Sequence, residues 1–289
     1  MMNKAIVNLL LLLLLNLIPA FAQNKTSFFS VENRLQFGDY LFCSRDYIRA
    51  IDEYNFVLSE KDNDSLKFKI GLAYQKLNRF NDSEKYFGMF GKNSPLLNEA
   101  NFEYYRSIYL SGFFTRLRGE FYLSSFNNSD YDNDIQKLVN LTKLYSNSEI
   151  DDSVSFFEPF NDNESVQLLK FYLRKKNLES KSPALAAVMS AVIPGLGKVY
   201  TENYGDGITA FLITGVLTFL SIDNFKANHD FRGWLFAGLA AYFYAGNVYG
   251  SAASAQIYNA NVRITFDSDL KLFLNKNNHF VPKSNWFCK

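Results

Sequence analysis

The residue types that most often carry out chemistry are few in this chain of 289 residues, and they are scattered. Neither histidine, His229 or His279, has a neighbour at the spacing of a metal-ligand pair. The acidic stretches at residues 62–64 and 151–152 fall in loop-like segments, where carboxylates are normally solvated. No HExxH, paired CxxC, phosphate-binding loop or nucleophile elbow occurs. The sequence therefore predicts no catalytic, cofactor-binding or metal-binding residue, and we do not expect an enzyme.

The two cysteines, Cys43 and Cys288, are separated by almost the whole chain. Small disulfide scaffolds carry closely spaced, even sets of cysteines, so this chain is not one of them. Cys43 falls in a helical pattern with Phe42 and Tyr47, where a small buried side chain is expected. A bond between the two cysteines requires that both face one oxidising compartment, and the sequence leaves this open.

Composition indicates a folded protein with about two domains. Apolar residues make up 48% and aromatic residues 17% of the chain, and the formal net charge is +1. No basic stripe of the kind that binds nucleic acid is visible. The nearest candidate, Arg174 to Lys176 with Lys181, precedes an apolar stretch. We interpret it as a cluster flanking a membrane segment, and a phosphate-binding cluster is the alternative.

Residues 1–22 have the pattern of an export signal. Lys4 supplies a positive start, Ala5 to Ile18 is an apolar run, and Pro19 to Ala22 ends in the small-x-small pattern of a cleavage site. The alternative is an uncleaved anchor, but the run is shorter than the ~20 residues that a spanning helix needs. Gln23 is therefore predicted to be the first residue of the exported protein.

Residues 23–180 are predicted to form a helical-repeat domain. Two stretches share one pattern of small and large residues, and Gly38 and Gly71 lie at equivalent places in them, 33 residues apart. Small residues let paired helices approach, and aromatic residues fill the space between them. The predicted packing residues are Gly38, Ala50 and Tyr54 in the first repeat, and Gly71, Tyr74 and Phe87 in the second.

This pattern resembles the tetratricopeptide repeat, whose period is about 34 residues. The first copy has Asp62 where the family has a late proline, and the second has Ser83 in place of the usual alanine. Beyond Pro95 the register is lost, although helical patterns continue at 98–124, 134–145 and 164–176. Another antiparallel helical array is the alternative. The resemblance implies a protein or peptide partner, although most aromatic residues of such an array pack between helices.

Residues 181–261 are predicted to be embedded in a membrane. Three uncharged stretches follow one another: Ser182 to Gly197, Gly207 to Ile222, and Gly233 to Ala255. The third is long enough to span a bilayer, the second is a little short, and the first is borderline. An all-helical soluble core is the alternative, but these stretches have almost no polar face to meet water.

The order of motifs in this region resembles a small membrane module of bacterial envelope proteins that often follows tetratricopeptide repeats. The resemblance covers residues 181–261. Its core residues here are Pro194, Gly195, Gly197, Tyr200, Gly205, Asp206 and Gly207, and a second motif contains Asn247 and Gly250. No reaction or cofactor is attached to this module, so the resemblance implies only a membrane location.

The core motif predicts a turn that fixes how two membrane segments pack. Pro194-Gly195 should end the first helix, and Gly197 and Gly205 should permit tight turns. Asp206 should cap the helix that starts at Gly207. A small-molecule or lipid-headgroup site at this turn is the alternative.

Three polar or small positions of the third stretch have their own predictions. Asn247 should form a hydrogen bond between helices. Gly246 and Gly250 favour close packing with a neighbouring helix, and a homo-oligomer contact there is the alternative to packing within the chain.

The tail at 262–289 alternates like a strand at Val262, Ile264 and Phe266, which predicts a small β-hairpin. The complete expectation is an all-α chain: a tetratricopeptide-like solenoid, then a module of two or three transmembrane helices. We expect a scaffold of the inner (cytoplasmic) membrane, with the repeats on the exported side, bound to a protein or peptide and to lipid, not to nucleic acid. The alternative function is a module for protein insertion, assembly or transport, with the repeats as its docking domain.

Overall fold

All regular structure in the described part of the chain is helical, as predicted. The computed structural model describes residues 30–123, 130–145, 147–148, 150, 152–282 and 288. The predicted signal peptide lies outside these residues. The helices are α2 (Val31–Cys43), α3 (Tyr47–Glu60), α4 (Asp64–Lys76), α5 (Phe80–Phe87), α6 (Leu97–Ser111), α7 (Phe114–Leu123), α8 (Asp130–Lys143), α9 (Ser153–Phe157), α10 (Asp162–Lys176), α11 (Pro183–Val192), α12 (Leu196–Tyr200), α13 (Tyr204–Lys226), α14 (Asp230–Lys276) and the short 3₁₀ helix η1 (Asn278–Phe280).

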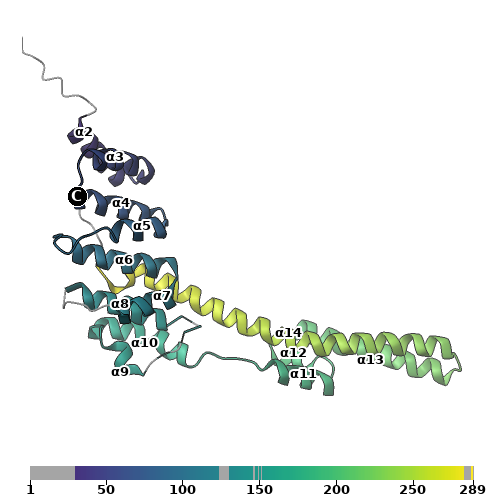
Figure 1. The fold of residues 1–289 in the computed structure, drawn as a ribbon. Coiled ribbons are helices and arrows are strands. Elements are labelled where there is room, and N and C mark those ends of the chain that lie inside the picture. The colour runs from purple at the N-terminus through teal and green to yellow at the C-terminus, as the bar shows by residue number, and fades with distance from the viewer. Residues whose placement is uncertain are drawn as a thin grey trace, which may run out of the picture. The chain divides into compact units, whose positions relative to one another are not determined.

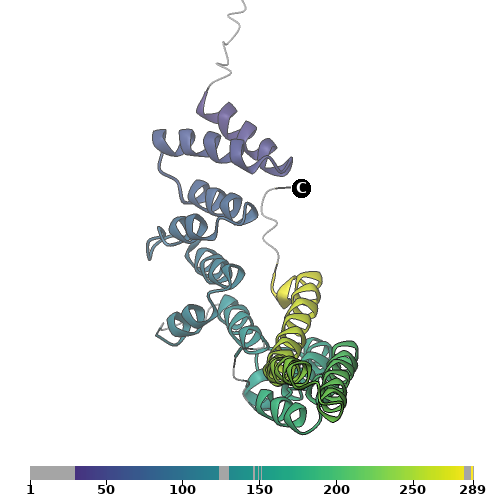
Figure 2. The ribbon, with the colours of Figure 1, turned by 90° about the vertical axis from the view of Figure 1, so that its right-hand side faces the viewer.

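The chain divides into two compact units, and the first contains residues 1–139 and 282–289. Its helices α2 to α7 form three successive pairs, each helix packing against the one before it (Figures 1 and 2). The first helices of the pairs begin at Val31, Asp64 and Leu97, so the 33-residue period of the sequence continues through a third pair. Gly112, in a left-handed conformation, separates α6 from α7 within the single helical stretch predicted at 98–124.

Short polar side chains start several of these helices. Ser30 and Asp46 accept hydrogen bonds from the backbone amides of Asn33 and Arg49 at the starts of α2 and α3. In the second unit, Asn161 and Glu164 form a reciprocal capping box at the start of α10. These caps satisfy amides that a helix leaves unpaired, so the chain itself defines where the helices begin.

The second unit contains residues 140–281, and in part of it α10 packs against the end of α14. Phe171 of α10 packs against Phe266 and Phe273 near the end of α14, with ring centroids 6.2 and 4.7 Å apart. The Arg174 guanidinium lies 2.6 Å from the Asp269 carboxylate. The far end of α14 thus packs on α10 through aromatic side chains and one ion pair.

The predicted β-hairpin at the tail is wrong. Val262 to Leu274 lies inside α14, and no described residue is in a strand. Phe266, Leu270 and Leu274 are fully buried at a spacing of four residues, which is the period of one helix face. The alternating residue Ile264, by contrast, is 63% exposed.

The remaining helices of this unit, α11 to α13 and the first part of α14, cover the stretch for which the motifs predict a membrane module; we call these helices the hairpin module. α13 and α14 lie side by side in both ribbon views, joined by the short turn at residues 227–229 (Figures 1 and 2). The Ser221 hydroxyl donates to the Gly233 carbonyl oxygen at 3.0 Å near that turn. Pro194-Gly195 lies between α11 and α12, which confirms the predicted helix break.

Only one described helix, α13, is long and apolar enough to cross a membrane. It has 23 residues, and 11% of its most apolar window is buried. The prediction that the stretch 207–222 is a little short for a span is wrong, because α13 extends it to 204–226. The stretch 233–255, predicted to be long enough to span, lies in α14, which is not among the described helices apolar enough to cross. That stretch is long enough, but its tyrosines, small residues and Asn247 reduce its mean hydropathy.

Candidate functional site

The predicted packing residues of the repeats do meet, and they do so twice in the same way. A Cβ atom built on Gly38 would lie 2.8 Å from Cε1 of Tyr54, and one on Gly71 would lie 2.8 Å from Cε1 of Phe87. In each pair the glycine of the first helix therefore faces an aromatic ring of the second. Ala50 is fully buried in the first pair. These contacts hold each pair at close range.

Serine at position 83 is buried and has a hydrogen-bonding role that alanine lacks. The Ser83 hydroxyl donates to the Gly71 carbonyl oxygen at 2.9 Å and lies 3.0 Å from the Ser107 hydroxyl of the third pair. Tyr74 is half-buried, and its ring lies 5.6 Å from that of Tyr86. The serine at position 83, a departure from the repeat pattern, thus links the second pair to the third.

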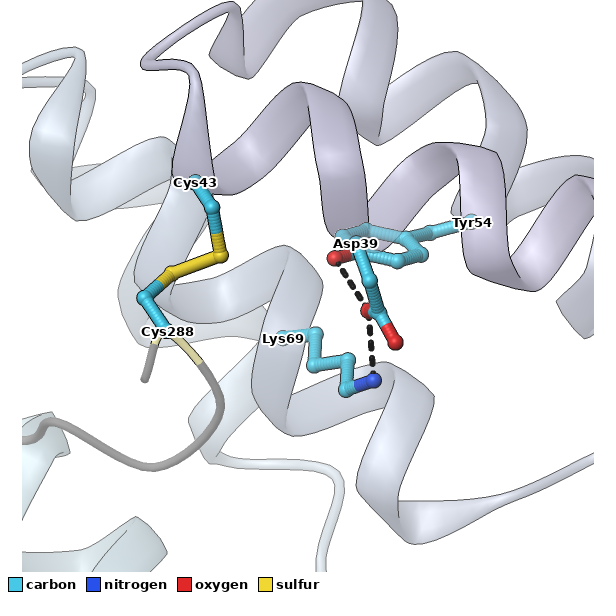
Figure 3. The surroundings of a disulfide bond; sticks show 5 residues. All are labelled: Asp39, Cys43, Tyr54, Lys69 and Cys288. Atoms are coloured by element: carbon cyan, nitrogen blue, oxygen red, sulfur yellow. Dashed lines mark hydrogen bonds and ion pairs between the residues drawn. A yellow bond between two sulfur atoms is a disulfide. The ribbon is translucent and has the colours of Figure 1, made fainter.

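The first two pairs are joined by a polar cluster that sequence reasoning missed. The Asp39 carboxylate accepts a hydrogen bond from the Tyr54 hydroxyl at 2.7 Å and lies 2.6 Å from the Lys69 ammonium (Figure 3). Burial raises the pKa of Tyr54 far above its usual value, and the bond to Asp39 raises it further. Tyr54 therefore stabilises the fold below about pH 10 and loses this contribution as the pH rises above its unfolded pKa.

Cys43 and Cys288 form a disulfide, with Cα atoms 5.5 Å apart (Figure 3). The prediction that Cys43 is a buried apolar residue is wrong, because both cysteines are exposed. The bond attaches the chain end to the last turn of α2. Pro282, also in the first unit, accepts a hydrogen bond from Arg106 of α6 at 3.2 Å. Pro282 and Cys288 are thus each bonded to a helix of the repeat array.

In the hairpin module, three motif glycines lie where no larger residue fits. Gly195 has a φ of +87°, and a Cβ atom on it would lie 2.0 Å from the Gly207 carbonyl oxygen. One on Gly197 would lie 1.9 Å from the Ala186 carbonyl oxygen. One on Gly207 would lie 2.8 Å from a Val199 methyl carbon. The motif therefore lets α11, α12 and the start of α13 approach with their backbones almost in contact.

Hydroxyl groups complete this junction. The Ser190 hydroxyl accepts from the Gly197 amide at 2.9 Å and lies 2.6 Å from the Ser251 hydroxyl of α14. The Thr201 hydroxyl lies 2.6 Å from that of Ser254. The first of these contacts joins α11 to α12, and the other two join this part of the chain to α14, so the polar atoms of the junction pair with one another.

Lys181 connects the start of the hairpin module to α12 and α14. The Lys181 amide donates to the Asn259 side-chain oxygen at 2.7 Å, and the Asn259 amide group donates to the Lys181 carbonyl oxygen at 2.8 Å. The Lys181 ammonium lies 5.2 Å from the ring centre of Tyr200 and 5.3 Å from that of Tyr258, at cation–π distance. Tyr200, a predicted motif residue, also accepts a hydrogen bond from the Ser182 amide.

Two predicted roles in the motif are wrong. Asp206 does not cap its helix, because α13 begins three residues earlier than expected, at Tyr204. The Asp206 carboxylate instead lies in the first helical turn, favourable for the helix dipole, and accepts from the Asn203 side chain at 3.0 Å. Gly205 forms no tight turn: it is exposed in α13, and a Cβ atom on it would meet nothing within 4 Å.

Two adjoining pockets lie at this end of the hairpin module and share Lys198 and Asp206; together we call them the base groove. One, of about 440 Å³, is lined mainly by polar side chains: Thr201, Glu202, Asn203, Ser254, Tyr258 and Asn261. The other, of about 460 Å³, continues between α13 and α14 and is more apolar: Ala210, Ile213, Tyr242, Phe243, Ala245 and Gly246. Gly250 lies beneath the Lys198 side chain, 3.7 Å from an ideal Cβ to Nζ.

Two buried polar side chains line the apolar part of the base groove. Asn247 is 4% exposed and Thr214 is 7% exposed. Neither polar atom of the Asn247 side chain has a hydrogen-bond partner among the described residues, nor does the Thr214 hydroxyl. The prediction that Asn247 bonds to a neighbouring helix is therefore wrong for the single chain.

Sequence reasoning missed Lys198 and Thr214, although Lys198 stands inside the recognised motif. Their roles depend on three helices converging, and no local pattern marks that convergence. Within the described residues, no group of three or more His, Cys, Asp or Glu side chains is arranged to hold a metal ion. Comparisons of the chain with protein-family models, curated proteins and solved structures found no match.

Proposed function

We propose that this chain is a membrane-anchored scaffold of a bacterial envelope, whose tetratricopeptide-like helix pairs bind a protein or peptide on the exported side. The hairpin module enters the inner membrane and holds that complex at its surface. This assignment rests on the chain's own residues and on the motif resemblance of the module.

The observation that carries the proposal is the outward apolar surface of α13. Its large apolar side chains are mostly exposed, between 50% and 66% at Ile208, Phe211, Leu212, Val216, Phe219 and Ile222. Exposing a contiguous apolar surface of this kind to water is unfavourable, and soluble monomers rarely do so. A lipid environment removes this cost, because each side chain then contacts acyl chains. The core helix of a soluble protein would instead be mostly buried.

Replacing two of these side chains by lysine tests the anchoring. We expect the wild-type protein to stay with the membrane pellet after alkaline washing. Val216→Lys with Phe219→Lys should move most of the protein to the aqueous fraction, because each charge at mid-membrane costs about 3 kcal/mol on insertion scales. Both residues are more than half exposed, so a water-soluble fold would tolerate the changes. Wild-type protein in the aqueous fraction would contradict the proposal.

The repeat array supports the scaffold part through an aromatic pair on α2. Phe37 and Tyr40 are 47% and 65% exposed, and their rings stack with centroids 6.4 Å apart. Exposed aromatic rings on a rigid helix are favourable contact residues, since they bury a large area and have few rotatable bonds. The packing of α2 on α3, and of α3 on α4, holds this helix in place.

A photo-reactive amino acid at position 40 tests the partner. In intact cells we expect a specific cross-linked product of defined mass, reduced about tenfold by Phe37→Ala, since an interface aromatic contributes 1–2 kcal/mol or more. The matched control is the same amino acid at Ile48, which is also 65% exposed but lies on α3. Equal products from both positions, or none from either, would contradict a partner on this face.

A second function is favoured by the base groove. Polar atoms at Asn247 and Thr214 that have no partner among the described residues, in the more apolar part of the groove, suit a module that binds a client protein and aids its insertion, assembly or transport. Under this function Asn247→Leu abolishes activity while the cross-link from position 40 persists. Under the scaffold function activity falls only together with the cross-link, as expected for Phe37→Ala.

A further inference from the structure

The lining of the base groove changes from polar to apolar along its length, as a phospholipid changes from headgroup to acyl chains. Its polar part and its apolar part meet at Lys198 and Asp206. From Asp206 to Ile213 the groove follows α13 for seven residues, roughly 10 Å at the helical rise. That length corresponds to a headgroup and glycerol at one end and the start of the acyl chains at the other.

A positive side chain, Lys198, and a negative one, Asp206, lie where the two parts of the groove meet, which suits a ligand with one negative and one positive group. Lys198 Nζ lines both parts of the groove and has no ion pair with any described residue. Asp206 lies in the same groove and accepts one hydrogen bond from Asn203. An ammonium favours a phosphate, and a carboxylate favours an amine.

The unpaired atoms deeper in the groove supply the second, independent observation. The Asn247 side chain and the Thr214 hydroxyl are more than nine-tenths buried, and neither has a hydrogen-bond partner in the part of the chain that the structure describes. Leaving such groups unsatisfied in an apolar environment costs about 1–3 kcal/mol each. Ester carbonyl oxygens of a glycerolipid would accept hydrogen bonds from the Asn247 amide group and the Thr214 hydroxyl.

From these features we infer that the base groove binds one phospholipid whose headgroup contains both a phosphate and a primary amine, such as phosphatidylethanolamine. The phosphate lies at Lys198, the amine at Asp206, and the ester region at Asn247 and Thr214. The acyl chains run between α13 and α14 past Tyr242 and Phe243. This inference rests on the proposed membrane anchoring, because only then does the groove open to lipid.

Lipid titration of the full-length, delipidated protein in detergent, followed by native mass spectrometry, tests the inference. We expect one phosphatidylethanolamine per chain, bound in preference to phosphatidylglycerol. Asn247→Leu and Lys198→Gln should weaken binding about tenfold, and Thr214→Val about threefold, as expected for the loss of one or two buried hydrogen bonds. Retention of the Cys43–Cys288 bond and an unchanged Tm show that a variant is folded.

Thr218→Val is the matched control, because its hydroxyl lies one turn from Thr214 but donates to the Thr214 carbonyl oxygen at 2.7 Å and does not line the groove. It should bind lipid like the wild type. Equal binding by all variants, no preference for the amine headgroup, or equal binding of water-soluble glycerophosphoethanolamine would each overturn the inference. So would a dimer that Asn247→Leu dissociates. Failure of the anchoring appears separately, as wild-type protein in the aqueous fraction.

Discussion

Gly197→Ala should destabilise the hairpin module by about 3 kcal/mol, near the upper end of the cost of overpacking a tight core. The added Cβ atom would lie 1.9 Å from the backbone oxygen of Ala186 and 2.8 Å from the Ser190 hydroxyl. A side chain could rotate away, but a backbone oxygen moves only if α11 moves with it. Thermal unfolding in detergent should show a Tm lower by about 10 °C.

Gly205→Ala is the control for this prediction, since it changes a glycine of the same motif. A Cβ atom at Gly205 meets nothing within 4 Å, and alanine is the better helix former. Its Tm should therefore equal or exceed that of the wild type. Equal loss of stability in Gly197→Ala and Gly205→Ala would contradict the packing described for the module.

Removing the disulfide should lower the free energy of unfolding by about 2–5 kcal/mol. The bond joins residues 245 positions apart, so it greatly restricts the unfolded chain. The variant that tests this is Cys43→Ser with Cys288→Ser, because a single change would leave one reactive thiol. Denaturant unfolding in detergent, with and without a reducing agent, measures the difference.

The reducing agent is also the control. It should lower the midpoint of the wild type to that of the double variant and leave the double variant unchanged. In cells, alkylation should find no free thiol in the exported wild type, and two free thiols when residues 1–22 are deleted and the protein stays in the cytoplasm. Free thiols in the exported protein would contradict the bond.

The parts of the fold that the sequence predicted are those with local, repeated patterns. Gly38 and Tyr54 lie 16 residues apart, as do Gly71 and Phe87, and both pairs are in contact. Such contacts within one helix pair follow from helical periodicity alone. The turn at Pro194-Gly195 was predicted for the same reason, because the conformational limits of these residues act locally.

The errors arose where a local pattern has two interpretations or where distant segments meet. Ile264 and Phe266 alternate as in a strand, yet Phe266 begins a helical series of buried residues at intervals of four. Periodicity over so short a stretch does not separate the two structures. The disulfide and the base groove depend on segments far apart in the chain, which no spacing rule connects.

The pairing of Cys43 with Cys288 also restricts how the chain threads a membrane. Two thiols oxidise to one bond only within a shared compartment, so the chain between them crosses any bilayer an even number of times. The sequence left open whether two or three segments cross. If α13 crosses once, α14 must return, and α11 stays on the side from which the chain entered. The parity of the crossings, and with it the location of the C-terminus beside the repeat array, follows from a single covalent bond.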